Sequence, residues 1–312
     1  MRARRGKSST ERRQSIDRRK SKVKLADFAS MPAEFSWYTC LESMIPKILR
    51  GRDLEELADR IAKAHAQDRP VVVMMGAHVV KCGLGALLCD LLRRGVISRI
   101  AMNGACAIHD VEIAMWGKTS EDVSEGLMSG LFGATEETAR FFAAAARASF
   151  DGRAGLGRSL GRALIEKKAP NRDFSVLATA RQIDVPATVH VAIGTDVVHQ
   201  HREADGAAIG YGTMADFRDF ASAIAAVRGG VVLNFGSAVI LPEVFLKALA
   251  MARNAGADLG RFTTANFDMI PLYRPIMNIV ERPRLVGATT FNFTGNHEII
   301  LPVLFASIMS RL

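Results

Sequence analysis

The residues best suited to chemistry lie in one short segment, Asp196-x-x-His199-x-His201-x-x-x-Asp205. Histidine titrates near neutral pH, so either imidazole could accept the proton released when an alcohol or amine is oxidised. His199 and His201 with Asp205 or His109 also match the donor set of a Zn²⁺ or Fe²⁺ site. A polar loop whose histidines only form hydrogen bonds would carry the same residues. Acid–base catalysis, a metal site and a hydrogen-bonded loop therefore all stay open.

Four other ionisable residues stand at predicted turns. Lys81 follows a predicted strand and could bind a phosphate or carboxylate, or form an imine if it is desolvated. His109 and Asp110 stand near a predicted helix start, where a catalytic role and a capping role are both open. Glu298 opens the last predicted helix and could be a general base, although the helix dipole alone also favours glutamate there.

Alternating strand and helix patterns must position these side chains. Short apolar runs predict strands at residues 70–75, 96–102, 187–193, 230–235, 260–265 and 285–292. Helical spacing marks residues 53–67, 83–94, 122–149, 155–168, 172–183, 215–228, 242–255 and 298–310. The alternation predicts an α/β fold, doubly wound and Rossmann-like, whose mostly parallel sheet has helices on both faces.

Ligands of such sheets bind at the carboxyl ends of the strands. Small and polar residues follow each predicted strand, at 76–78, 103–105, 194–196, 236–238, 264–268 and 294–298. Glycine lets a backbone approach a ligand closely, and helix N-termini offer N–H groups to phosphates. We therefore expect the binding site at this edge, although strand-end glycines are also ordinary turn residues.

The net charge of +9 resides in the first 24 residues. They hold 11 basic and 2 acidic side chains, whereas the other 288 residues hold 30 of each sign. A basic DNA-binding domain would carry its charge on the folded surface, so this distribution argues against one. With so few apolar residues, residues 1–24 are predicted to be a disordered tail, either without a dedicated role or contacting an acidic partner, nucleic acid or lipid. Residues 25–312 are predicted to form one domain.

The four cysteines, Cys40, Cys82, Cys89 and Cys106, show no CxxC spacing, which is typical of free thiols. Cys82 and Cys106 lie beside predicted turns, where a nucleophile is possible and a small buried side chain is commoner. No apolar run approaches the roughly 20 residues that span a bilayer, so no membrane contact is expected. The Arg- and Ser-rich start is no secretory signal and leaves a transit peptide open, but we expect a cytoplasmic protein.

Four segments, in order, resemble the deoxyhypusine synthase family. They are residues 75–114, VPATVHVAIGTD at 185–196, residues 232–266 and the closing helix HEIILPVLFASI. The resemblance covers most of residues 70–310, and it is specific in order and spacing but loose in identity. It implies a Rossmann-like fold, a homotetramer, and a small-molecule substrate that is oxidised or transferred with NAD as cofactor.

The resemblance also implies which residues would contact NAD. In this chain they are Asn103, Gly104, Ala105, Asp110, Asp196, Gly236, Ser237, Ala238, Thr264 and Ala265, with Asn296 where the family keeps an acid. Small residues would admit the pyrophosphate, and a carboxylate such as Asp110 or Asp196 could accept from ribose hydroxyls.

Two departures from the family pattern concern the transfer chemistry. The family's imine-forming lysine lies in a Trp-Gly-Lys motif before the last strand, yet this chain has no lysine after Lys247. The acid that holds the family's polyamine is replaced by His201, which suggests a neutral or anionic substrate.

The sequence thus predicts an NAD-binding enzyme of the deoxyhypusine synthase type that acts on a small substrate and does not make deoxyhypusine. Its predicted catalytic residues are His199, His201, Lys81, His109 and Glu298. Two alternatives stay open. One is a metal-dependent hydrolase or lyase that uses the His199/His201 pair, and the other is a nucleotide-sensing binding protein.

Overall fold

A six-stranded, all-parallel sheet forms the centre of the computed structural model, which describes residues 12–25 and 45–312. Its order is β5-β3-β2-β6-β7-β8, with bounds Ala187–His190, Arg99–Asn103, Val71–Met75, Val231–Phe235, Thr263–Asp268 and Thr289–Thr294. Counted along the chain, the strands are ordered 3-2-1-4-5-6, as in dinucleotide-binding α/β folds. The winding direction reverses between β2 and β6, which we call the switch point. The predicted α/β, Rossmann-like fold class is confirmed.

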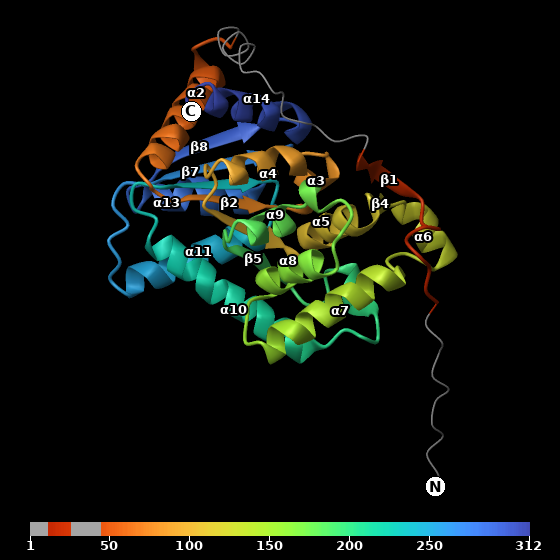
Figure 1. Cartoon of the computed structure of the whole chain (residues 1–312). Coiled ribbons are helices and arrows are strands. Elements are labelled where there is room, and N and C mark those ends of the chain that lie inside the picture. Colours follow the sequence, from red (N-terminus) through yellow and green to blue (C-terminus); the bar gives the residue numbers. More distant parts are fainter. Residues whose placement is uncertain (1–11, 26–44) are drawn as a thin grey trace.

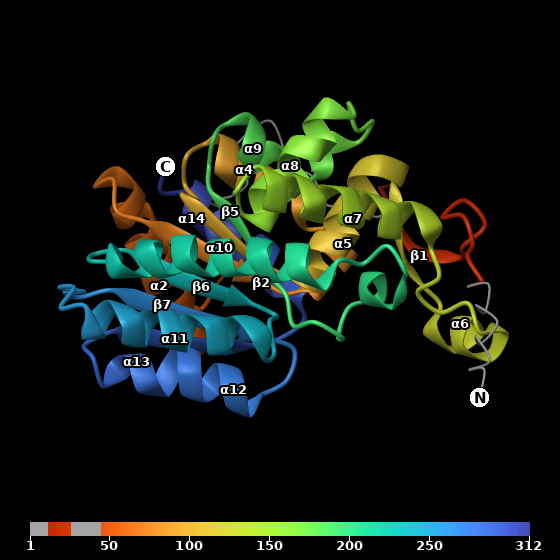
Figure 2. The ribbon, with the colours of Figure 1, turned by 90° about the horizontal axis from the view of Figure 1, so that it is seen from below.

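Helices cover both faces of the sheet because its strands are apolar on both sides. In β2, Val71, Val73 and Met75 pack into one core, whereas Val72 and Met74 pack into the other. The first core is covered by α2 (Leu49–Ala66), α3 (Ala77–Lys81), α4 (Gly85–Arg93), α5 (Gly104–Trp116), α9 (Val176–Gln182) and α14 (His297–Met309). The second is covered by α10 (Gly206–Ala225), α11 (Ile240–Asn254) and the π-helix η4 (Ile276–Glu281). Figures 1 and 2 show α2 and α14 on one side, and α10 and α11 on the other.

The remaining elements lie around this sheet. α7 (Glu136–Asp151) packs on α8 and α10, and α8 (Leu156–Glu166) packs on α9 and β5. Short elements complete the chain: β1 (Ser21–Lys24), β4 (Lys118–Glu121), α6 (Val123–Ser129), η2 (Arg172–Phe174), η3 (Val197–Gln200), α12 (Tyr273–Pro275) and α13 (Arg282–Arg284). Among the described residues, no helix has both the length and the apolar character needed to cross a bilayer.

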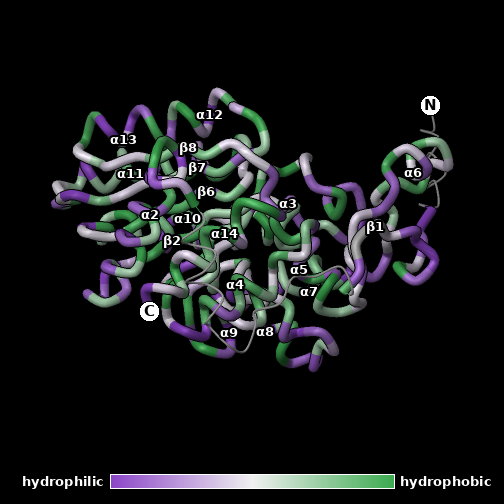
Figure 3. The backbone as a smooth tube through the Cα atoms, turned by 90° about the horizontal axis from the view of Figure 1, so that it is seen from above, coloured by the Kyte–Doolittle hydropathy of each residue, from purple (hydrophilic) through white to green (hydrophobic). Residues whose placement is uncertain are grey.

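The expectation of a disordered tail is wrong for residues 12–24. β1 pairs antiparallel with β4, and Ile16 is completely buried. The guanidinium of Arg19 makes two 2.8 Å bonds to the carboxylate of Glu112, so a charge that looked solvated is neutralised inside the protein. Figure 3 shows β1 and α6 together at one end of the molecule, beyond the helices that cover the sheet. Residues 1–11, and Cys40 within 26–44, lie outside the described residues.

Some predicted boundaries are also wrong. The helix expected over residues 122–149 is two helices, because Gly130 ends α6 in the left-handed conformation with φ +69°. The strand expected over 285–292 begins only at Thr289, since α13 ends at Arg284 and residues 285–287 form a turn in which Gly287 has φ +92°. β7 runs to Asp268, three residues beyond the predicted end, because Asn266 is accommodated inside the sheet. Its side chain bonds Asn234 at 2.8 Å and Asn292 at 2.9 Å across the neighbouring strands.

Candidate functional site

The two strand ends at the switch point meet through glycine. A Cβ on Gly76 would lie 2.2 Å from the carbonyl oxygen of Gly236, so no side chain fits there. Gly236 itself has φ +64°, and a Cβ on it would lie 2.5 Å from the imidazole of His297. These glycines bring β2, β6 and the start of α14 into direct contact.

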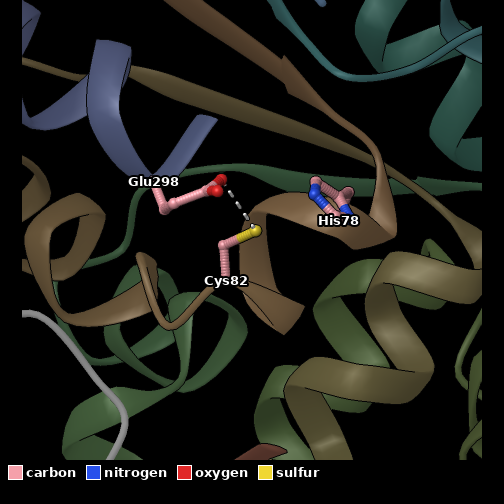
Figure 4. A group of neighbouring side chains, drawn as sticks. All are labelled: His78, Cys82 and Glu298. Atoms are coloured by element: carbon pink, nitrogen blue, oxygen red, sulfur yellow. Dashed lines mark hydrogen bonds between the residues drawn. The ribbon is translucent and has the colours of Figure 1, made fainter. Parts of the chain in front are cut away.

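Three side chains with metal-binding or acid–base chemistry gather beside this contact. We call His78, Cys82 and Glu298 the switch-point cluster (Figure 4). One ligand atom from each lies within 4.8 Å of the others, and the Cys82 thiol donates to Glu298 Oε2 at 3.7 Å. Burial and the Glu298 carboxylate raise the pKa of Cys82 to about 11, so its thiol is protonated at neutral pH. Burial, together with His297 and Lys81, lowers the pKa of His78, which keeps that imidazole neutral.

Two buried acceptors beside the cluster have no partner among the described residues. They are Asp268 Oδ2, at the end of β7, and His297 Nδ1, in the first turn of α14. His297 Nε2 lies 3.2 Å from the carbonyl oxygen of Phe267 and must donate to it, so Nδ1 is the ring nitrogen that remains for a ligand. The rings of His78 and His297 lie 5.4 Å apart. A ligand with hydroxyl, amide or ammonium donors would satisfy these atoms.

A cavity of about 220 Å³ lies on the other side of Lys81, at the end of β3. We call it the β3 pocket; its ionisable lining residues are Arg19, Lys81, His109, Glu112, Glu121 and Asp196. His109 Nδ1 lies 2.5 Å from the Thr119 hydroxyl, and burial lowers the pKa of His109 to about 4. Within the described part of the chain, Arg19 Nε and Glu121 Oε2 have no hydrogen-bond partner, although the Arg19 guanidinium is paired with Glu112. The pocket could therefore hold a small polar ligand.

We call residues 196–205 the histidine loop. Its ionisable side chains form hydrogen bonds with backbone groups of the protein. His199 Nδ1 accepts from the backbone N–H groups of Gly194 and Asp196, at 3.1 and 3.2 Å. His201 is buried, with Nε2 2.8 Å from the carbonyl oxygen of Gly133, and Asp205 caps α10 through Ala207 and Ala208 N–H. In the part of the chain that the structure describes, the only group of converging metal-ligand atoms is the switch-point cluster. The alternative of a metal site at His199 and His201 therefore has no converging set of ligand atoms among the described residues, and His201 Nε2 faces the protein's own backbone.

The predicted NAD contacts around β3 have structural partners. Asn103 caps α5 by accepting from Cys106 N–H at 2.8 Å, and Gly104 lies directly under the Asp196 carboxylate. Ala105 lines the β3 pocket. Asp110 is 1% exposed and accepts from Ser175 Oγ, Val176 N and Leu177 N. It therefore caps α9, and a ribose cannot reach it in this structure.

Among the NAD contacts predicted after β6, β7 and β8, some residues are also engaged in hydrogen bonds within the protein, and others are exposed. Ser237 is buried and its hydroxyl accepts from Leu241 N–H, whereas Ala238 is exposed at the edge. Thr264 and Ala265 lie in the middle of β7 rather than at its end, and the Thr264 hydroxyl donates to the Ile279 carbonyl. Asn296 is exposed and begins α14 without a side-chain cap, so the first N–H groups of that helix are open to a ligand.

The structure brings together two predicted catalytic residues, Lys81 and Glu298, with three that the sequence analysis did not select. The three are His78, Asp268 and His297. A signal for one of them was present, because His78-x-x-x-Cys82 puts an imidazole and a thiol one helical turn apart directly after a strand. Asp268 and His297 lie in the segments 264–268 and 294–298, which were expected at the binding edge, but no motif distinguished them from their neighbours.

No protein-family model matches this chain, and neither does any curated protein. Several solved structures share its fold. The complex of AgrE with ornithine and NAD⁺ superposes with a TM-score of 0.55 at 15% identity, over 85% of this chain and 34% of that one. A LOR/SDH protein from Methanococcus maripaludis gives 0.54 and 12%, over 85% and 69%.

A candidate deoxyhypusine synthase from Entamoeba histolytica gives a TM-score of 0.55 at 10% identity, over 91% of this chain and 97% of that one. The deoxyhypusine synthase-like fold implied by the sequence resemblance is thus confirmed. The chain spans about a third of the length of AgrE. At these identities the likeness concerns the fold.

Proposed function

We propose that this protein is an NAD-binding enzyme that oxidises a small substrate, or transfers a group from it, at the switch point between β2 and β6. The observation that carries the proposal is the position of the switch-point cluster. Its ionisable side chains lie where the 3-2-1-4-5-6 strand order reverses, and sheets of this order bind dinucleotides at that point. AgrE, with the same fold, was solved with NAD⁺ bound.

The residues at the switch point fit a dinucleotide. The open N-terminus of α14 offers N–H groups and the positive end of a 13-residue helix to a phosphate. Asp268 Oδ2 and His297 Nδ1 are buried acceptors that ribose hydroxyls or a carboxamide would satisfy. The N-terminus of α11 offers fewer free N–H groups to a phosphate, because the Leu241 N–H already donates to the Ser237 hydroxyl and Pro242 has no N–H.

The chain's own residues would handle protons beside the cofactor. When bound, NAD⁺ supplies a hydride acceptor. Glu298 is exposed and His78 is held neutral, so either can take the proton that an alcohol or amine loses on oxidation. The carboxylates of Asp268 and Glu298 favour a substrate that carries hydroxyl or amino donors. The expectation from His201 was a neutral or anionic substrate; these carboxylates favour the neutral kind, or an amine, over an anion.

The lysine relay of the deoxyhypusine synthase family has no counterpart at the corresponding place in this chain. Lys81 lies between the switch-point cluster and the β3 pocket, and its positive charge acts on His78, Cys82 and His109. We assign it a binding role toward an anionic group of the cofactor or substrate. A homotetramer and an acidic partner for the N-terminus remain predictions from the sequence.

Two matched aspartates test the proposal. Asp268 and Asp196 both lie at this edge with raised pKa values caused by burial, but only Asp268 belongs to the switch point. Calorimetric titration with NAD⁺ should show that Asp268→Asn weakens binding about tenfold, the effect of one lost hydrogen bond, whereas Asp196→Asn binds as the unaltered chain does. No NAD⁺ binding at millimolar concentration, or a loss confined to Asp196→Asn, would contradict the proposal. Binding without turnover of any alcohol or amine would favour the nucleotide-sensing alternative.

A further inference from the structure

The switch-point cluster has the composition of a transition-metal site. Its donors are an imidazole, a thiol and a carboxylate, the three side-chain types that bind Zn²⁺ in proteins. Two of them are soft or borderline donors, which favours Zn²⁺ or Co²⁺ over Mg²⁺ or Ca²⁺. We propose that His78, Cys82 and Glu298 together bind one Zn²⁺ ion.

The distances suit such an ion. With Zn–S near 2.3 Å and Zn–O near 2.0 Å, two ligands of a tetrahedral zinc lie about 3.5 Å apart. The Cys82 sulfur and Glu298 Oε2 are 3.7 Å apart, and all three ligand atoms fall within 4.8 Å of one another. Small side-chain rotations are therefore enough to close the site.

His78 lies in α3 and Cys82 directly follows its last residue, so the two ligands are held one above the other. Cys82 N–H donates to the His78 carbonyl oxygen at 2.8 Å, so the two residues stand one turn apart on the same face. Val79 and Val80 between them are buried in the core, and Gly83, at φ +77°, ends the helix directly after Cys82. A short helix fixed in this way presents both donors without a further ordering cost.

The third ligand comes from another element and leaves the site open. Glu298 is exposed in the first turn of α14, whose Leu301 and Leu304 are fully buried. Three protein ligands leave one tetrahedral position for water or for a substrate atom, the arrangement of catalytic zinc sites. Of the charges nearby, Lys81 opposes a cation and Asp268 favours one. This site does not rest on the NAD⁺ proposal. With the ion bound, His78 and Glu298 would be its ligands, and a water in the open position would replace them as the proton acceptor.

Metal binding must displace the thiol proton. The Cys82 S–H bond breaks, the sulfur lone pair forms the Zn–S bond, and one proton passes to solvent. Each equivalent of Zn²⁺ should therefore release about one proton, which calorimetry in buffers of different ionisation enthalpy measures directly. The apparent affinity should rise with pH for the same reason.

Cobalt provides the decisive measurement, made on the full chain without a polyhistidine tag and stripped with a chelator. One equivalent of Co²⁺ should produce a thiolate-to-cobalt charge-transfer band and tetrahedral visible bands, and Zn²⁺ should abolish both. Cys82→Ser should remove the charge-transfer band, and His78→Ala or Glu298→Gln should weaken Co²⁺ binding by more than about 100-fold. Cys89→Ala and His65→Ala are matched controls that should change neither signal.

Glu298→Gln alters only an exposed side chain, so its result does not depend on whether the other variants fold. The proposal fails if no charge-transfer band forms on the unaltered chain. It also fails if the band survives Cys82→Ser, if Glu298→Gln binds Co²⁺ as tightly as the unaltered chain, or if His65→Ala loses binding as His78→Ala does.

Discussion

The histidines at the carboxyl edge of the sheet form two groups, one near the end of β3, which we call the β3 side, and one at the switch point. The groups differ in the hydrogen bonds that their side chains already make within the protein. On the β3 side, His109, His199 and His201 each have a hydrogen-bond partner within the protein. At the switch point, the imidazole of His78 makes no hydrogen bond among the described residues, and within them His297 Nδ1 is buried without a partner. Polar groups that satisfy one another stabilise a fold, whereas unsatisfied buried groups are typical of places where a ligand binds. The difference teaches that three ionisable residues close in sequence do not by themselves form a site.

The largest effect should come from breaking the buried ion pair of the β3 side. Arg19→Ala leaves the Glu112 carboxylate buried, with its charge uncompensated, and should lower the free energy of unfolding by about 3–5 kcal/mol. Arg12→Ala is the matched control, because the one bond of the Arg12 side chain within residues 12–25 and 45–312 is to the Ser129 carbonyl at the surface. Urea denaturation measures both. Equal losses in the two variants would show that the N-terminal segment is not held by the buried pair.

A second effect depends on pH. Burial raises the pKa of Asp196 from 3.8 to about 6, so the folded protein binds its proton more tightly than the unfolded chain. Stability from this group is complete below about pH 4 and is lost as the pH rises through 6, on the order of 1–3 kcal/mol. Asp196→Asn should remove this part of the pH dependence, as denaturation curves between pH 4 and 7 would show. Curves that stay parallel over this range would contradict the assignment.

A third prediction is that the histidine loop contributes to stability and not to NAD⁺ binding. His201→Ala removes the partner of the Gly133 carbonyl in a buried setting and should cost about 1–2 kcal/mol of stability. NAD⁺ affinity should not change, because the loop has no part in the switch point. A strong loss of NAD⁺ binding in a variant that remains folded would reverse the roles of the two sides.

The smallest effect is expected at His78. His78→Ala removes a half-buried ring that has no hydrogen bond to any described residue, so the free energy of unfolding should change by less than about 1 kcal/mol. Thermal and urea denaturation of the metal-free protein measure it. A loss as large as that of His201→Ala would mean that His78, too, stabilises the fold.

Hydrophobic pattern predicted most of the fold. Buried runs such as residues 70–75 and 230–235 agree with β2 and β6, because strands apolar on both faces occur in covered parallel sheets. The pattern could not find the asparagines that bond across β6, β7 and β8, since their partners are distant in sequence. β7 was therefore ended too early, and Thr264 and Ala265 were placed at an edge that they do not reach.

The site was predicted only where sequence position implied geometry. Lys81 follows β2, which ends at the switch point. Glu298 follows the edge strand β8, and it lies near the switch point because the start of α14 packs on Gly236. The roles proposed for His199 and His201 stay predictions, because spacing cannot show that one nitrogen of each ring faces the protein's own backbone. The charged N-terminus was undervalued for a similar reason, since the partner of Arg19 lies 93 residues away.

The position of NAD⁺ in a crystal of the full chain tests the central claim most directly. We expect the dinucleotide across the carboxyl ends of β2 and β6, with a phosphate at the start of α14 and a donor group on Asp268. Density for NAD⁺ over Gly104 and the histidine loop, or an empty switch point at saturating NAD⁺, would contradict it.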